Sequence, residues 1–202
     1  MTNMPLIRYL SNKYDNHAQH LNWGYDSVSC EYATVRYSDV SVVNFLFSHS
    51  THSTNFVKND DTISYMIRID EIFVSRSHSA FNRVTSGAKE IGNEIQREFE
   101  EHMNNIYRYI LPGLFQRKAL ELMTSGSVEI ASMTFKNNGS VVINGTTYKM
   151  SDLQFFLQNG QWIIKSSAQR TLFGNPKQIA SISISEDNAI LIEPMLKLMK
   201  EL

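Results

Sequence analysis

Two stretches of the chain share one pattern. Residues 148–156 read YKMSDLQFF, and residues 35–43, which lie 113 positions earlier, read VRYSDVSVV. Each has a basic residue, one variable residue, a Ser-Asp pair and then an aliphatic residue. Asp and Ser side chains hydrogen-bond nearby backbone N–H groups, so a strand that ends before the pair can turn there and re-enter a strand. Because no histidine lies within several residues of either serine, the pattern predicts one structural corner built twice rather than a reactive site.

From Tyr25 to about Ser75 the chain is rich in β-branched and aromatic residues, which favour strands, whereas residues 1–24 are polar and ambiguous. Short alternating strands are predicted over 28–37. The apolar run 40–47 is predicted to be a central strand, and the polar run 48–55 a loop. Strict alternation over 62–69 predicts a half-buried strand.

After residue 80 the spacing of apolar residues changes to steps of three and four, which predicts a long helix over 88–111. Its apolar stripe consists of Ile91, Ile95, Phe99, Met103, Ile106, Ile110 and Leu114. Pro112-Gly113 is expected to break or kink this helix, with a second helix over 114–123. Thr85 and Ser86 are its candidate N-caps.

Three Asn-Gly dipeptides, at 138–139, 144–145 and 159–160, dominate the last third, where they predict β-hairpins. They delimit strands at 128–135, 140–143, 147–150, 153–157 and 161–165. Residues 166–177 are predicted to form a loop, and residues 179–184 a further strand. A closing helix is predicted over 188–202, with Ser185, Glu186 and Asp187 as candidate caps.

Around both corners the predicted order is strand, corner, strands and helix, and this order resembles tandem pleckstrin-homology-like (PH-like) proteins of bacteria. Residues 126–202 carry the resemblance best, from the NNG turn through YKMSDL and FFLQNGQWIIK to ISISEDNAILIEPMLKLM. The resemblance implies an α+β fold with two PH-like antiparallel β-rich halves, at 1–83 and 124–202. The long amphipathic helical connector, 84–123, would join them, and a C-terminal helix would cap the second half.

The same resemblance implies a scaffold that binds protein or lipid rather than a catalyst. Phosphoinositide-binding members carry several basic residues on the first hairpin, which pair with phosphates. Here the hairpin at 135–139 offers only Lys136, and no arginine follows until Arg170. Specific phosphoinositide recognition is therefore not expected.

Composition narrows the class of partner. The net charge of −1 argues against nucleic acid, because duplex binding relies on neutralising several phosphates. The single cysteine, Cys30, fits a reducing compartment, and the N-terminal residues lack a basic start followed by an apolar run. These features predict a cytoplasmic location.

The sequence favours a non-enzymatic interaction module that binds a protein partner through a sheet edge, a loop or a helix surface. The candidate binding residues are Lys165, Arg170, Phe173 and Lys177, in a segment that also fits a solvated connector. Weak membrane-surface association is a subordinate interpretation, no cofactor is expected, and the oligomeric state stays open.

Two further alternatives remain. The first is a small metal-dependent hydrolase that uses His49 and His52. These residues form an HxxH pair, and His17 and His20 form a second one. The second is a toxin-neutralising or phage-conflict protein.

Overall fold

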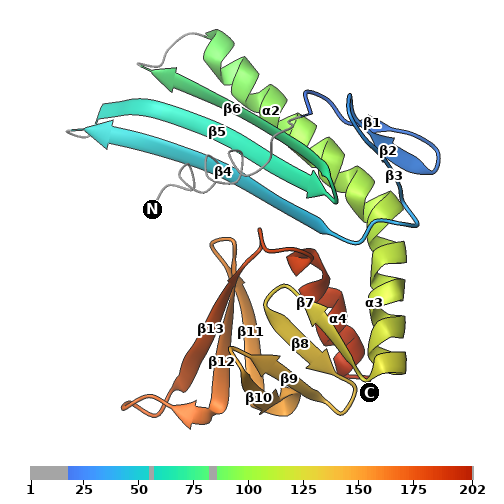
Figure 1. Ribbon diagram of the computed structural model, residues 1–202. Helices are drawn as coiled ribbons and strands as arrows, with labels where there is room; N and C mark the ends of the chain where they lie inside the picture. Colours follow the sequence, from blue (N-terminus) through green and yellow to red (C-terminus); the bar gives the residue numbers. More distant parts are fainter. Residues whose placement is uncertain (1–17, 55–56, 82–85, 202) are drawn as a thin grey trace. The chain divides into compact units, whose positions relative to one another are not determined.

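The chain forms a mixed α+β structure, which confirms the predicted class. The computed structural model describes residues 18–54, 57–81 and 86–201, and the chain divides into two compact units, Met1–Leu111 (unit 1) and Pro112–Leu202 (unit 2). Within the described residues the strands form four small antiparallel sheets (Figure 1). None of the described helices is both long and apolar enough to cross a membrane.

The described residues of unit 1 form two three-stranded antiparallel sheets. The smaller sheet consists of β1 (Asn22–Trp23), β2 (Ser27–Ser29) and β3 (Thr34–Arg36). The larger sheet consists of β4 (Val43–Thr54), β5 (Val57–Ile69) and β6 (Ile72–Phe81), with β5 in the centre. Two predictions are therefore wrong: the strand predicted over 40–47 is an edge strand of this sheet, and most of the predicted loop 48–55 belongs to it. The ladder with β5 continues through the polar residues because it is made by backbone groups.

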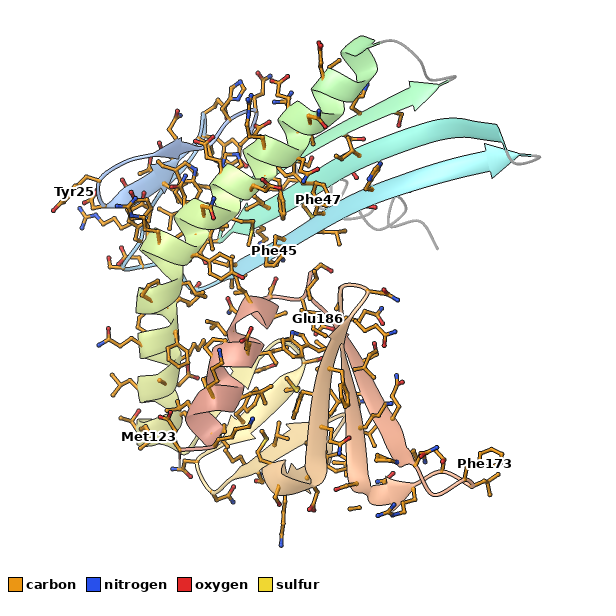
Figure 2. The ribbon with its side chains drawn as sticks, turned by 180° about the vertical axis from the view of Figure 1, so that it is seen from behind. Tyr25, Phe45, Phe47, Met123, Phe173 and Glu186 are labelled. Carbon is orange, nitrogen blue, oxygen red and sulfur yellow. The ribbon has the colours of Figure 1, made fainter. Side chains whose placement is uncertain are left out.

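Over residues 62–69 the central strand β5 is buried on both faces, apart from the half-buried Arg68, whereas a half-buried strand was predicted. Phe99 of the long helix α2 (Ser86–Asn105) packs on one face, with its ring centroid 5.0 Å from Phe47 and 5.7 Å from Tyr65. Figure 2 shows Phe45 and Phe47 directed toward this helix. Leu46, Met66 and Phe73 form a buried cluster of their own. Apolar side chains packed against both faces thus bury even the polar Thr62 and Ser64 of this alternating sequence.

The helical segment continues through Pro112 instead of breaking there. After α2 comes a π-helical turn, η1 (Ile106–Ile110), in which the N–H of Leu111 donates to the carbonyl of Ile106, and then α3 (Leu111–Ser125). Proline has no N–H to donate, and a π-turn next to it re-registers the backbone hydrogen bonds. The apolar stripe is confirmed from Ile95 to Leu114, whereas Ile91 is exposed. The candidate cap Thr85 lies outside the described residues.

Unit 2 has a four-stranded sheet followed by a three-stranded one. The four-stranded sheet consists of β7 (Ser127–Ile130), β8 (Met133–Lys136), β9 (Ser140–Ile143) and β10 (Thr146–Lys149), in the order β10-β9-β8-β7. The three-stranded sheet consists of β11 (Leu153–Gln158), β12 (Gln161–Arg170) and β13 (Pro176–Ser183). A 3-10 turn, η3 (Ala189–Leu191), then leads into α4 (Ile192–Met199).

The three Asn-Gly turns are confirmed, each with its glycine at positive φ. The strand predicted over 128–135 is instead a hairpin, because Ala131 turns the chain at φ 52°, a conformation that alanine does not signal in a sequence. The closing helix is shorter than predicted and starts after Asn188, at φ 61°, without a side-chain cap. The proposed caps at 185–187 are therefore wrong.

Both Ser-Asp pairs lie in turns between strands, but their aspartates do not cap backbone N–H groups in the described part of the chain. Ser38 Oγ donates to Asp39 Oδ1 at 2.8 Å in the turn between β3 and β4. Ser151 Oγ donates to Asp152 Oδ1 at 3.4 Å in η2 (Met150–Asp152), between β10 and β11. The corners therefore share their place in the element order and a local Ser-Asp hydrogen bond.

A carboxylate that does cap backbone groups is that of Asp70, in the two-residue turn between β5 and β6. It accepts hydrogen bonds from the Ser41 N–H at 3.1 Å, the Ser41 hydroxyl at 2.6 Å and the Val42 N–H at 2.9 Å. Its own N–H donates to the Val42 carbonyl at 3.0 Å. Asp70 thus holds the residues just before β4 against the C-terminal end of β5.

Candidate functional site

The β12–β13 hairpin carries the four residues that the sequence singled out for binding. The loop predicted over 166–177 is wrong in extent, since residues 166–170 extend β12 and residues 176–177 begin β13. The two strands stay paired at Ser166–Lys177 and Arg170–Pro176, with a bulge between these pairs. The connecting loop is reduced to residues 171–175. Residues 166–170 are mostly polar, so the spacing of apolar residues did not predict that the strand continues through them.

The structure brings three of these residues together and places the fourth further along the sheet. Arg170, Phe173 and Lys177 lie at the end of the hairpin, where Lys177 is exposed. Lys165 lies opposite Gln178, and its ammonium sits 5.4 Å from the ring centroid of Phe156 on β11. The predicted residues therefore form a hairpin tip, defined here as residues 170–177, with Lys165 behind it.

The apolar part of the hairpin tip is Leu172 and Phe173, which are 102% and 90% exposed. Figure 2 shows Phe173 at the far end of the hairpin, pointing away from unit 2. Leu172 was missed from the sequence, although its position next to Phe173 in a polar stretch was a usable signal. Two neighbouring large apolar side chains at full exposure are the kind of feature that marks an interaction site.

Backbone and side-chain hydrogen bonds hold the tip in one conformation. The Thr171 N–H donates to the Asn175 carbonyl at 2.8 Å, and the Gly174 N–H donates to the Thr171 carbonyl at 2.9 Å. Arg170 Nη1 donates to the Gly174 carbonyl at 2.7 Å. Gly174 adopts φ +79°, a conformation that favours glycine. The two apolar side chains are thus presented on a folded turn.

The sheet that carries this tip has charges of one sign only. Residues 153–185 contain Lys165, Arg170 and Lys177 and no aspartate or glutamate, although the whole chain has a net charge of −1. The surroundings of the tip therefore favour a negatively charged partner.

The edge strand β11, with the sequence LQFFLQ, is a second exposed apolar feature of unit 2. In the described part of the chain it pairs with β12 alone. Phe156 and Leu157 are 45% and 60% exposed, and the strand carries no charged residue. Natural edge strands are usually protected by charges or proline, so an uncharged apolar edge is open to pairing with another strand.

The main buried polar cluster of unit 1 links Trp23, Tyr65, Arg76, Glu98 and His102. The Trp23 indole N–H donates to His102 Nδ1 at 3.2 Å, which places the proton of a neutral imidazole on Nε2, 3.8 Å from Glu98 Oε1. Arg76 Nη1 donates to Glu98 Oε2 at 2.6 Å. Tyr65 lies near Glu98, but its hydroxyl makes no hydrogen bond of good geometry.

Burial controls the protonation of this cluster. Desolvation lowers the pKa of His102 below its ordinary value, against the opposing charges of Glu98 and Glu101. Desolvation also raises the pKa of Tyr65, and the charge of Glu98 adds to this effect. Both groups are therefore neutral at pH 7. Because Tyr65 is fully buried and His102 nearly so, the cluster ties β1, the larger sheet and α2 together rather than facing a substrate.

The histidine pair at 49 and 52 lies on strand β4 rather than in a loop. Positions three apart on a strand fall on opposite faces, so this placement does not bring the two positions to one metal ion. His49 is exposed, and among the described residues no group of three or more His, Cys, Asp or Glu side chains is arranged to hold a metal ion. His17 lies outside the described residues.

Comparison with known proteins returned no relative: no protein-family model, curated protein or solved structure matches this chain.

Proposed function

We propose that the chain is a tandem PH-like interaction module without catalytic activity, which binds a protein partner through the edge of strand β11. The proposal of PH-like units rests on the order of elements. In unit 2 a four-stranded meander, a three-stranded meander and a helix follow one another along the chain. Unit 1 repeats this order with one strand fewer in its first sheet.

The observation that carries the binding proposal is the exposed, uncharged edge of β11. An extended segment of a partner adds to such an edge through backbone hydrogen bonds, and pockets for alternate side chains supply specificity. Phe156 and Leu157 point to opposite faces of the strand, so each face of an added strand would meet one exposed apolar side chain. A charged side chain on this edge would oppose the addition.

A comparison of two variants of the full chain tests this function. Leu157→Lys places a charge on the edge, whereas Leu120→Lys places the same charge on α3 at a residue of almost equal exposure, 62% against 60%. A partner captured from the native host is expected to be retained by Leu120→Lys and lost by Leu157→Lys. With the purified partner, backbone amides of β11 are expected to gain protection from hydrogen exchange. Equal capture by both variants, or unchanged exchange in β11, would refute the proposal.

A further inference from the structure

We propose that the hairpin tip, residues 170–177, is a membrane-contact element that inserts Leu172 and Phe173 into the interface of an anionic bilayer. Arg170 and Lys177 would then lie at the level of the lipid phosphates. This site is separate from the β11 edge, so it goes beyond the proposed function and does not depend on it.

The first argument is the shape of the exposed apolar surface. Leu172 and Phe173 are neighbours at the very end of a hairpin and are 102% and 90% exposed. A projecting pair of this kind can enter a soft, planar interface without a matching pocket. The other large exposed apolar residues of unit 2, Leu120, Met123, Phe156 and Leu157, lie on a helix or within a strand and are less exposed.

The second argument is that the tip is already folded for insertion. Its N–H groups at Thr171 and Gly174 and its carbonyls at Thr171, Gly174 and Asn175 have partners within the loop. Backbone groups that are paired internally lose less free energy when they leave water. No large ordering of the loop is needed either, because the same hydrogen bonds exist before contact.

The third argument is charge complementarity. The cations Arg170 and Lys177 flank the apolar pair, Lys165 stands behind them on the same sheet, and residues 153–185 contain no carboxylate. Anionic lipids attract basic residues near the surface, and lone apolar insertion without such charges binds only weakly. The combination of two apolar side chains and adjacent cations therefore fits an anionic bilayer better than a neutral one.

Vesicle binding by the full chain tests the proposal. Co-sedimentation is measured with vesicles of phosphatidylcholine alone and of phosphatidylcholine mixed with phosphatidylglycerol. Binding is expected on the mixed vesicles and is expected to weaken as salt rises. Phe173→Ser is expected to weaken it by about tenfold, because most of a large apolar side chain leaves the interface. Lys177→Gln is expected to weaken it by about fivefold.

Matched control variants distinguish insertion of the tip from nonspecific adsorption of the chain to vesicles. Leu120→Ser removes an exposed apolar residue from α3, and Lys149→Gln removes an exposed lysine from β10; both are expected to bind as the unchanged chain does. Insertion is read from an environment-sensitive fluorophore at Phe173→Cys in a Cys30→Ser background, with Thr147→Cys as the control site. Only the label at 173 is expected to shift its emission to the blue on mixed vesicles.

Several results would overturn the proposal. Absence of binding to both kinds of vesicle would do so, as would equal losses for Phe173→Ser and Leu120→Ser. A label at 173 that stays in water on bound vesicles would also refute insertion. If Phe173→Ser abolishes the capture of a host protein while vesicles do not bind, the tip is a protein-binding site. Loss of partner capture by Leu157→Lys, with vesicle binding intact, concerns the β11 edge alone.

Discussion

Asp70 is the residue whose replacement tests the architecture of unit 1 most directly. Its carboxylate accepts three hydrogen bonds from Ser41 and Val42, at 3.1, 2.6 and 2.9 Å. A hydrogen bond to a charged group contributes roughly 1.5–3 kcal/mol when well shielded, but Ser41 is exposed, so about 1 kcal/mol each is appropriate. Asp70→Ala is therefore expected to lower the free energy of unfolding by about 3 kcal/mol.

The left-handed backbone at Asp70 allows substitutions to distinguish the stability contributed by the carboxylate from the cost of conformational strain. Its φ of 48° is left-handed, which costs alanine about 1 kcal/mol more than glycine. Aspartate bears this cost as well, so Asp70→Gly loses the same three hydrogen bonds but relieves about 1 kcal/mol of strain, and is expected to lose about 2 kcal/mol. Asp70→Asn keeps an acceptor and tolerates this conformation, so its loss is expected to be the smallest of the three.

Urea unfolding followed by fluorescence measures these losses. Trp162→Phe leaves Trp23 of unit 1 as the sole tryptophan, so the signal then reports on the unit that contains Asp70. Asp39→Ala is the matched control in the same unit, since its carboxylate accepts only the 2.8 Å bond from Ser38 among the described residues. A loss below about 1 kcal/mol for Asp70→Ala, the value of a single ordinary hydrogen bond, would refute the capping account.

Two further predictions concern helix α2. Ile95→Asp is expected to unfold unit 1, because it buries an unpaired charge at a residue that is 2% exposed, whereas Ile91→Asp, one turn earlier and 39% exposed, is expected to leave the melting temperature nearly unchanged. The pKa of His102 is lowered in the folded chain, so the unfolded chain binds more protons and unit 1 is expected to lose stability as pH falls below the ordinary histidine pKa of about 6.5. His102→Gln is expected to flatten this dependence in urea unfolding at a series of pH values, and an unchanged slope would contradict the assignment.

The features that the sequence predicted correctly are those encoded locally. Asn-Gly turns place their glycine at positive φ, and the stripe from Ile95 to Leu114 repeats with the helical period, so both are visible in short windows. The extension of β4 through 48–54 was missed because cross-strand backbone pairing does not require apolar side chains. The same reason explains the longer β12 and the shorter loop around Phe173.

The sequence identified the residues of the candidate site but not their arrangement, because the arrangement depends on strand pairing. The sequence identified a predicted loop with basic and aromatic residues, namely Lys165, Arg170, Phe173 and Lys177. The convergence of Arg170, Phe173 and Lys177 at a tip depends on the pairing of Arg170 with Pro176, which a short window of sequence does not reveal. The role of Asp70 was not visible either, because its three acceptor bonds reach back across 28 and 29 positions.

The two units differ in the length of their helix relative to their strands. In unit 1, α2 has 20 residues and spans about 30 Å, against about 43 Å for the 13-residue strand β5. In unit 2, α4 has only eight residues and spans about 12 Å, against about 33 Å for the ten-residue strand β12. A helix of that length buries Ile192, Met195 and Met199 but cannot cover the whole sheet. The three-stranded sheet carries the tip at Leu172 and Phe173 and the open edge at β11, the strand that follows the second Ser-Asp corner. Extending α4 by designed apolar turns is therefore expected to reduce the exposure of the sheet without altering unit 1.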